Sequence, residues 1–360
     1  MNNNLALLTT GVGSLPHLET KEAMELIQHT FEDIPHWPQL PNQGTNEDML
    51  NQYISPLVKL GLVTAINGQK PFFDTARFDW YERVADFYSS YLEITESTGS
   101  LSSFSFPEDS AQGFYTFLEN FAEGIFTGAK FVKGQITGPL TLGLQITDQN
   151  KKSAYYSQEL REIVVKSLAL QAHWQTKELS RFGKPVLMFI DEPGLYAYGQ
   201  STFITLNKNE ITEEFNEIID AIHLAGGMAG IHVCASTDWS IILDSKADIL
   251  NFDAFGYFTS MTLYIEELKT FLERGGIVAW GLVPTSEKVL DLKAEDLVTI
   301  FEQSIDSLVQ KGISKERLLQ QALITPSCGV GSCSVELAEK VYGLTMEVSL
   351  RLREKYGLLL

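Results

Sequence analysis

Short apolar segments alternate with longer amphipathic segments along most of this chain of 360 residues. The apolar runs are expected to be strands, at about residues 6–13, 36–40, 131–136, 186–191, 228–234, 249–254, 277–283 and 322–327. Parallel strands buried on both faces read as continuous apolar runs, and a set of eight separated by helices is what a (β/α)8 barrel requires. The pattern therefore predicts an α/β protein with one TIM-barrel domain over residues 1–360.

Amphipathic helices are expected between these strands. Residues 20–29, 212–224 and 335–356 have apolar side chains at helical spacing, with charged side chains on the opposite face. The main alternative is an open doubly wound sheet. No GxGxxG motif follows the first strand, and the Gly11–Ser14 segment is too short to replace it. The barrel is therefore the favoured architecture.

The interval 42–130, between the second and third expected strands, is too long for one crossover. It contains Asn67-Gly68 between two short apolar runs, a pattern typical of a β-hairpin. We expect this interval to be an insertion that forms either a lid over the barrel mouth or the surface of a homodimer.

The formal net charge of −19 and the pI near 4.7 argue against binding to nucleic acid or to an anionic membrane surface. No apolar run reaches the roughly 18 residues of a membrane-spanning helix. The first ten residues lack the basic and apolar regions of a signal peptide. Three cysteines do not make a disulfide framework, so a cytoplasmic protein is expected.

His232-x-Cys234 and the distant Cys328 supply three soft metal ligands. Residues i and i+2 of an extended segment point to the same side, so His232 and Cys234 can bind one ion together. Cys328 ends a similar apolar run, and thiolate and imidazole ligands that converge from two strand ends suit Zn²⁺. The alternative is a buried histidine with two inert core cysteines, which is common for free cysteine. Spacing alone leaves both interpretations open.

Polar residues gather at the expected carboxyl ends of the strands, where barrels place their functional residues. They are Gly13-Ser14, Gln39, Gln135-x-Thr137-Gly138, Asp191-Glu192, His232-x-Cys234, Asp253, Gly281 and Cys328. An unpaired carboxylate is costly at the mouth of a buried strand, so Asp191 and Glu192 are candidates for substrate binding. Capping of the following helix, which has Pro193 in its first turn, is the alternative for Asp191. The concentration of these residues favours the metal site.

These positions resemble the catalytic domain of cobalamin-independent methionine synthase. The motifs stand in that family's order from Thr9 to the final helix: Thr9–Pro16, Ile136–Thr141, Ile190–Pro193, Ile231–Cys234, Ala247–Asp253 and Pro326–Gly329. The match covers that enzyme's C-terminal barrel, and its N-terminal barrel has no counterpart in this sequence. More distantly, the chain resembles the uroporphyrinogen decarboxylase superfamily, which includes zinc-dependent methyltransferases that take methyl groups from corrinoid proteins.

The resemblance implies a zinc-dependent methyltransferase that acts on a small thiol such as homocysteine. Its Zn²⁺ would be held by His232, Cys234, Cys328 and a carboxylate. Asp253 stands where that family has a glutamate; because Asp is one methylene shorter, direct ligation and a water bridge both remain open. A free thiol has a pKa of about 8.5, and coordination to Zn²⁺ removes its proton and makes the sulfur nucleophilic.

The resemblance also implies how the amino acid is held. Backbone groups of Gly13 and Ser14 would receive the substrate carboxylate, and Asp191 would pair with the ammonium group. A simple turn role for Ser14 is the alternative. His17 would protonate a leaving group or complete the zinc shell, unless it is only a polar residue near the mouth. Cys333 is expected to be structural.

Two departures from the synthase pattern concern the methyl donor. Leu142–Ile146 has no counterpart of the tryptophan associated with the folate pterin, and Trp280–Ser286 has no histidine to protonate folate. A methylcorrinoid leaves without that proton, so a free or protein-bound corrinoid is favoured over methyltetrahydrofolate. A uroporphyrinogen decarboxylase-like activity is less favoured because such sites use arginines near the first strand, and the first arginine here is Arg77. A non-catalytic zinc- or thiol-binding barrel is a further alternative.

Overall fold

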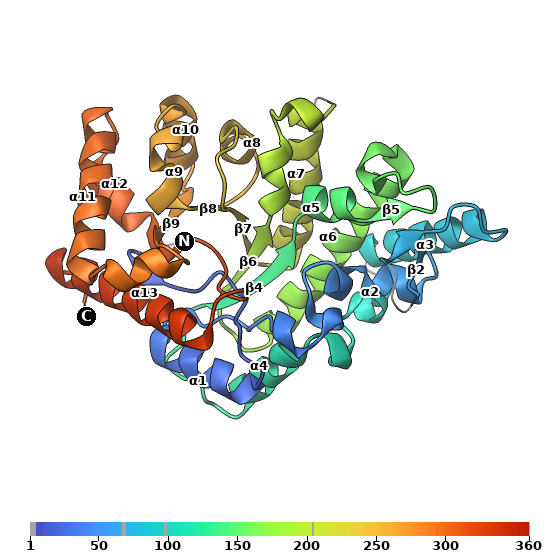
Figure 1. The fold of residues 1–360 in the computed structure, drawn as a ribbon, viewed down its shortest axis with the longest axis horizontal. Coiled ribbons are helices and arrows are strands. Elements are labelled where there is room, and N and C mark those ends of the chain that lie inside the picture. Colours follow the sequence, from blue (N-terminus) through green and yellow to red (C-terminus); the bar gives the residue numbers. More distant parts are fainter. Residues whose placement is uncertain (1–4, 67–69, 97–98, 204, 360) are drawn as a thin grey trace.

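A parallel sheet, curled into a half-barrel, forms the centre of the molecule and is surrounded by helices (Figure 1). The computed structural model describes residues 5–66, 70–96, 99–203 and 205–359. The strands of this sheet follow the order β1-β10-β9-β8-β7-β6-β4. Their bounds are β1 Leu8–Thr9, β4 Val132–Thr137, β6 Val186–Asp191, β7 Met228–Val233, β8 Ile249–Phe252, β9 Ile277–Val283 and β10 Ala322–Pro326. The predicted mixed α/β class with a parallel sheet is confirmed.

The segment 36–40, expected to be the second strand, forms no regular strand. Isolated bridges join His36 to Lys133 on β4 and Gln39 to Ser14 beyond β1. Pro35 and Pro38 have no N–H group to donate, which prevents a continuous ladder in this segment. In the described residues the central sheet therefore has 7 strands, and a complete eight-stranded barrel is not shown.

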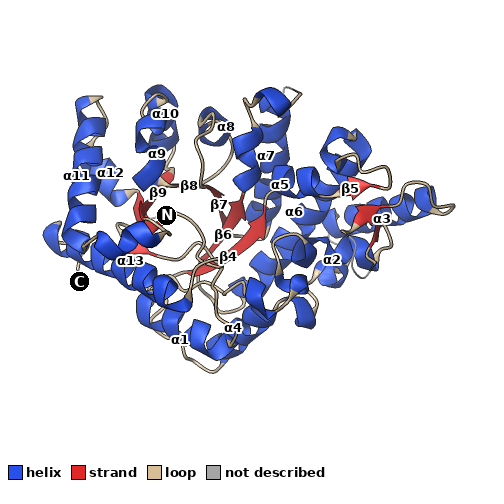
Figure 2. Cartoon of the chain, in the orientation of Figure 1, coloured by secondary structure: helices blue, strands red, loops and turns tan. Residues whose placement is uncertain are grey.

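Helices surround the sheet (Figure 2). They are α1 Thr20–Thr30, α2 Asn51–Lys59, α3 Trp80–Thr95, α4 Gln112–Ala122, α5 Pro139–Gln145, α6 Gln158–Ser180, α7 Lys208–Leu224, α8 Ser240–Leu243, α9 Ala254–Met261, α10 Ile265–Glu273, α11 Ala294–Gln310, α12 Lys315–Gln320 and α13 Val335–Lys355. Short 3₁₀ helices lie at Pro41–Gln43, Thr45–Glu47, Leu101–Phe104, Glu108–Ser110, Ala154–Tyr156, Pro193–Ala197, Ser201–Phe203 and Glu287–Asp291. The three helices expected at 20–29, 212–224 and 335–356 correspond to α1, α7 and α13. No helix of the described residues is long and apolar enough to cross a membrane.

The interval 42–130 contains α2, α3 and α4, and α3 extends away from the central sheet (Figure 1). Two of its segments, β2 Val63–Thr64 and β3 Phe72–Phe73, pair antiparallel, as the hairpin pattern predicts. The turn itself lies outside the described residues. β3 also pairs with β5 Thr147–Asp148, which follows α5, so a second small sheet joins the interval 42–130 to the segment after α5.

Apolar side chains form separate cores on the two faces of the sheet. In β6, Leu187 and Phe189 belong to the inner cluster, whereas Met188 and Ile190 belong to the outer cluster beneath the helices. This division follows from the alternation of side chains along a strand. Polar residues of the same inner parity therefore lie above the inner cluster, at the carboxyl ends of the strands.

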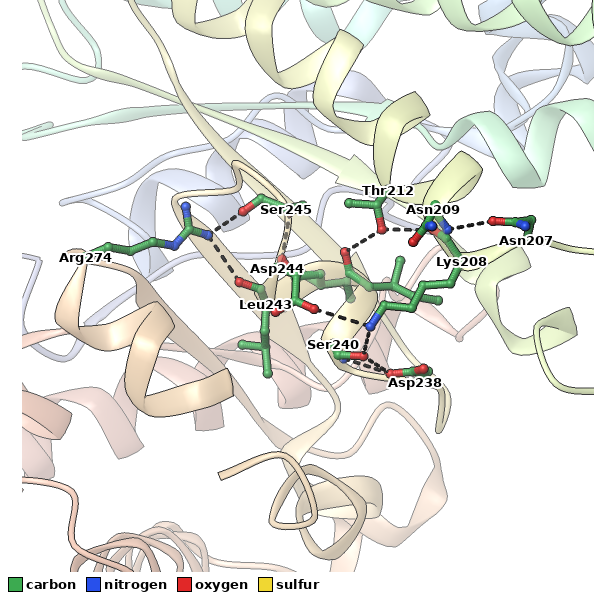
Figure 3. A network of polar contacts seen from close by, with 12 residues as sticks. Asn207, Lys208, Asn209, Thr212, Asp238, Ser240, Leu243, Asp244, Ser245 and Arg274 are labelled. Atoms are coloured by element: carbon green, nitrogen blue, oxygen red, sulfur yellow. Dashed lines mark hydrogen bonds and ion pairs between the residues drawn. The ribbon is translucent and has the colours of Figure 1, made fainter. Parts of the chain in front are cut away.

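The connection between β7 and β8 contains only the short helix α8 and is held by two cations from neighbouring elements (Figure 3). Lys208, at the start of α7, donates to Ser240 Oγ at 2.5 Å. Arg274, after α10, donates to the carbonyl oxygens of Ser245 at 2.6 Å and Ala247 at 2.9 Å. The Arg274 bonds satisfy two carbonyl oxygens that follow α8, and the bonds of both cations fix the connection that follows Cys234.

Candidate metal and substrate site

His232, Cys234 and Cys328 lie together at the carboxyl edge of the sheet. Their ligand atoms are all within 4.8 Å of one another, so in the described part of the chain these three residues form a group that could hold a metal ion. His232 is on β7, Cys234 follows the same strand, and Cys328 follows β10. The structure thus brings together the three ligands that the sequence pattern selected.

Asn251 on β8 orients the His232 ring. The Asn251 amide nitrogen donates to Ala279 O at 2.9 Å and to Thr325 Oγ1 at 2.8 Å. Its oxygen is therefore left to accept from His232 Nδ1, at 2.6 Å. This assignment puts the ring proton on Nδ1 and leaves a lone pair on Nε2. His232 Nε2 is buried and has no hydrogen-bond partner, which is the arrangement a metal ligand requires.

The two cysteines interact directly. The hydrogen bond from Cys328 lowers the pKa of the Cys234 thiol, although burial opposes this shift. The same hydrogen bond, together with burial, raises the pKa of Cys328. The Cys234 thiol therefore loses its proton more readily than the Cys328 thiol, and both sulfur atoms lie beside His232. Two soft sulfurs and one nitrogen form a donor set that a metal ion such as Zn²⁺ fits.

A cavity of about 250 Å³ opens beside these three residues. Its lining comes from strand ends and adjoining loops: Val12, Ser14, Gln39, Pro41, Met49, Asp191, Pro193, His232, Cys234, Cys328, Gly329, Gly331 and Ser332. Met49 belongs to the interval 42–130, so this interval contributes to the wall of the cavity. The cavity is large enough for a small amino acid and joins the ligand group to polar residues of other strands.

Asp191 lies at the end of β6 and lines this cavity. Burial raises the pKa of its carboxyl group to about 6, and the charges of His232 and Lys133 act in the opposite direction. Its Oδ1 atom is buried without a hydrogen-bond partner. An unsatisfied carboxylate oxygen in a cavity is available for a cationic group of a ligand.

Glu192 has a different place from its neighbour Asp191. Its carboxylate accepts from the backbone N–H groups of Leu140 at 2.9 Å and Thr141 at 2.8 Å, and from the Thr141 hydroxyl. These bonds satisfy the first turn of α5 and tie it to β6. Burial raises the pKa of Glu192 to about 7, although these hydrogen bonds favour the ionised form. The carboxylate of Glu192 therefore holds two elements together, and Glu192 is not among the residues that line the cavity.

Gly13 and Ser14 lie where the chain leaves β1. Gly13 has a φ of +151°, and a Cβ atom there would be 2.7 Å from Gln135 Cδ, so only glycine fits. Ser14 lines the cavity, and its Oγ accepts from the N–H of Gly331 at 3.2 Å. Ser14 O also accepts from Val330 N at 3.2 Å. Ser14 thus holds the loop that follows Cys328 at the side of the cavity.

Asp253 is not part of the three-residue ligand group. Its carboxylate accepts from Gly256 N at 2.7 Å and caps the N-terminus of α9. Burial raises the pKa of Asp253, and the charge of Cys234 contributes in the same direction, which places the carboxylate within electrostatic range of the ligands. The structure therefore shows Asp253 as a helix cap near the group.

His17 and Cys333 lie apart from the ligand group. His17 is 2% exposed, and its Nδ1 has no hydrogen-bond partner. Burial lowers the pKa of His17, against the charges of Glu22 and Glu339. His17 is not a lining residue of the cavity. The Cys333 thiol donates to Thr285 O at 3.5 Å.

Two polar residues of the inner face, Asn251 and Lys133, were not selected from the sequence. Lys133 on β4 is 1% exposed; its ammonium donates to Val12 O at 2.6 Å and lies 4.7 Å from the centre of the Phe189 ring. Burial lowers its pKa to about 8. Each residue interrupts an apolar run at a position of inner parity, and this is the signal by which sequence reasoning could have found them.

No family model and no curated protein matches this chain at a significant level. The geometry of the site and the motif resemblance are therefore the two grounds for a function.

Proposed function

We propose that this protein is a zinc-dependent methyltransferase that transfers a methyl group to a small thiol, with homocysteine as the first candidate. The observation that carries the proposal is the group of His232, Cys234 and Cys328, with the free Nε2 of His232 oriented by Asn251. The adjoining cavity with the unsatisfied Asp191 carboxylate offers a place for an amino-acid substrate. The motif resemblance to cobalamin-independent methionine synthase points to the same chemistry and to methionine biosynthesis.

The proposal includes closure of the barrel by the segment 36–40. Its isolated bridges to Lys133 on β4 and to Ser14 beyond β1 support this closure. Proteins with (β/α)8 barrels place their sites at the carboxyl ends of the strands. The ligand group and the cavity lie at that end.

Each residue has a distinct part in the proposed chemistry. Zn²⁺, held by His232, Cys234 and Cys328, would keep the substrate sulfur deprotonated and available for attack on a methyl group. Asn251 holds the His232 ring so that Nε2 faces the site. Asp191 would pair with the substrate ammonium group through a charge-assisted hydrogen bond. Asp253 would act on the site electrostatically from its position at the start of α9.

The proposed methyl donor is a methylcorrinoid, free or bound to a protein. The chain lacks the histidine and the tryptophan that the synthase family uses for folate, and a general acid is worth about 10²–10⁴-fold in rate. A cytoplasmic location belongs to the same proposal, since a reducing compartment keeps both cysteines available for zinc.

Metal analysis followed by a transfer assay tests the proposal. The purified protein is expected to contain about one Zn²⁺ per chain and to methylate homocysteine faster with methylcobalamin than with methyltetrahydrofolate at equal concentration. Bound zinc without turnover with either donor would favour a non-catalytic zinc-binding barrel. Absence of zinc after reconstitution would overturn the metal assignment. Faster turnover with methyltetrahydrofolate would reject the corrinoid and require another proton donor, with His17 the first to mutate.

A further inference from the structure

Three neighbouring strands each present a buried polar atom without a partner at the same level of the sheet. Thr137 on β4 pairs in register with Asp191 on β6, and Asp191 pairs with His232 on β7. Thr137 Oγ1, Asp191 Oδ1 and His232 Nε2 have no hydrogen-bond partner. Register partners on neighbouring parallel strands point to the same face, so these atoms lie in one row on the inner face.

Such a row is costly unless a ligand completes it. A buried polar group without a partner costs about 1–3 kcal/mol relative to a satisfied one. His232 Nε2 belongs to the ligand group, which leaves the oxygen atoms of Thr137 and Asp191 to be explained. Thr137 is 1% exposed, so bulk water does not satisfy its hydroxyl. It lies outside the cavity lining but pairs in register with Asp191, which belongs to that lining.

The nearest buried cation does not satisfy these oxygens. Lys133 lies four residues before Thr137 on the same strand, and its ammonium donates to Val12 O at 2.6 Å and to Gln135 Oε1 at 3.5 Å. Its charge nevertheless acts on Asp191, which favours the ionised carboxylate. Two acceptor oxygens on neighbouring strands, one of them on a carboxylate, match a group with several N–H donors and a positive charge.

We infer that Thr137 is a specificity-determining residue that, together with Asp191, binds the primary ammonium group of the substrate. Asp191 supplies the charge, and the Thr137 hydroxyl accepts a second hydrogen bond from the same nitrogen. The pair selects an amino thiol over a thiol that lacks the amine. That the substrate carries a thiol rests on the proposed function, whereas binding of an ammonium group does not. The ammonium site and the methyl transfer can therefore be tested separately.

The experiment measures binding by calorimetry to the full-length, zinc-loaded protein. The probes are L-homocysteine, L-norvaline, which has a methyl group in place of the thiol, and 4-mercaptobutyrate, which lacks the amine. Thr137→Val should weaken binding of the first two probes by about tenfold, the weight of one hydrogen bond to a charged group, and leave 4-mercaptobutyrate unchanged. Thr137→Ser keeps the hydroxyl and should restore binding.

A stability measurement separates this role from a structural one. Because the Thr137 hydroxyl has no partner, Thr137→Val should leave the Tm of the ligand-free protein unchanged or raise it. The matched control is Thr9→Val: Thr9 Oγ1 donates to Ile324 O at 2.8 Å, so its loss should lower the Tm without changing binding of any probe.

The outcomes distinguish the two proposals. Equal binding of homocysteine and norvaline by the wild type and by Thr137→Val would overturn the inference, as would an equal loss for 4-mercaptobutyrate. Failure of both amine-containing probes to bind the wild type would overturn it as well. Norvaline binding that depends on Thr137, without methylation of homocysteine, would support the ammonium site and reject the methyltransferase.

Discussion

Replacement of Asn251 tests whether the metal site depends on its supporting hydrogen bonds. Asn251 is 1% exposed and fixes His232 through a bond of 2.6 Å while donating to Ala279 and Thr325. In Asn251→Leu, a leucine side chain of similar volume replaces the asparagine and removes all of these bonds. Supporting partners of metal ligands typically contribute 10–100-fold to metal affinity. We therefore expect Zn²⁺ to bind about 10–100-fold more weakly, or about 1.4–2.8 kcal/mol.

The same substitution should also destabilise the metal-free protein. It leaves His232 Nδ1 and the Thr325 hydroxyl buried without the partner they have now. At about 1–3 kcal/mol for each unsatisfied group, the free energy of unfolding should fall by about 2–6 kcal/mol. Urea unfolding of the metal-free protein measures this term, and competition with a chromophoric chelator measures zinc affinity.

Two further variants make the result decisive. Thr325→Val removes one acceptor of Asn251 but leaves the bond to His232, so it should change zinc affinity by less than about threefold. Asn251→Asp keeps an acceptor for Nδ1, in the manner of carboxylate–histidine–metal arrangements, and should retain zinc. A folded Asn251→Leu protein with the zinc affinity of the wild type would refute the reasoning.

Five other substitutions address four single residues of the site. Cys234→Ser and Cys328→Ser should each lose zinc in metal analysis, because a hydroxyl is a poor zinc ligand; full occupancy in Cys328→Ser would shift the assignment to Cys333. Asp253→Ala should lower the free energy of unfolding by about 1 kcal/mol because the α9 cap is lost, whereas Asp253→Asn keeps the cap. Loss of zinc from the Asn variant under chelator challenge would show that the charge of Asp253 supports the metal. Unchanged zinc retention in that variant would limit Asp253 to capping. Asp191→Asn should raise the KM for homocysteine more than the KM for 4-mercaptobutyrate, and equal effects on both would exclude pairing with the ammonium group.

Most of the sheet could be predicted because its strands are buried on both faces. The run 186–190, which precedes Asp191 in β6, and the strand Ile277–Val283 contain no charged side chain, and no amphipathic alternative competes with them. The same criterion predicts a strand at 36–40, but Pro38 within this segment and Pro35 directly before it have no N–H group to donate, which interrupts pairing. Apolar character is therefore a good guide to burial, whereas a continuous ladder also depends on every N–H group being present.

Residues of the site could be predicted only where the residue type or a short spacing in the sequence indicates their role. The spacing of His232-x-Cys234 predicts its geometry, because alternation in a strand puts both side chains on one face. Asn251 contacts His232 from another strand, 19 residues away, and no spacing rule reports such a pair. Asp253 could have been recognised as a helix cap, since Asp is a preferred N-cap residue and Ala254–Met261 follows it directly.

The curl of the sheet explains how distant ligands meet. Between β7 and β10 lie two other strands, so the lateral separation along a flat sheet would be about 14 Å at about 4.8 Å per strand. The ligand atoms of the His-Cys-Cys group are nevertheless within 4.8 Å of one another. Gly281 on β9 permits this close approach, because a Cβ atom there would be 2.5 Å from Phe252 O and 2.9 Å from Ser327 Cα. Gly281→Ala should therefore separate the strand ends on both sides and weaken metal binding without changing any ligand.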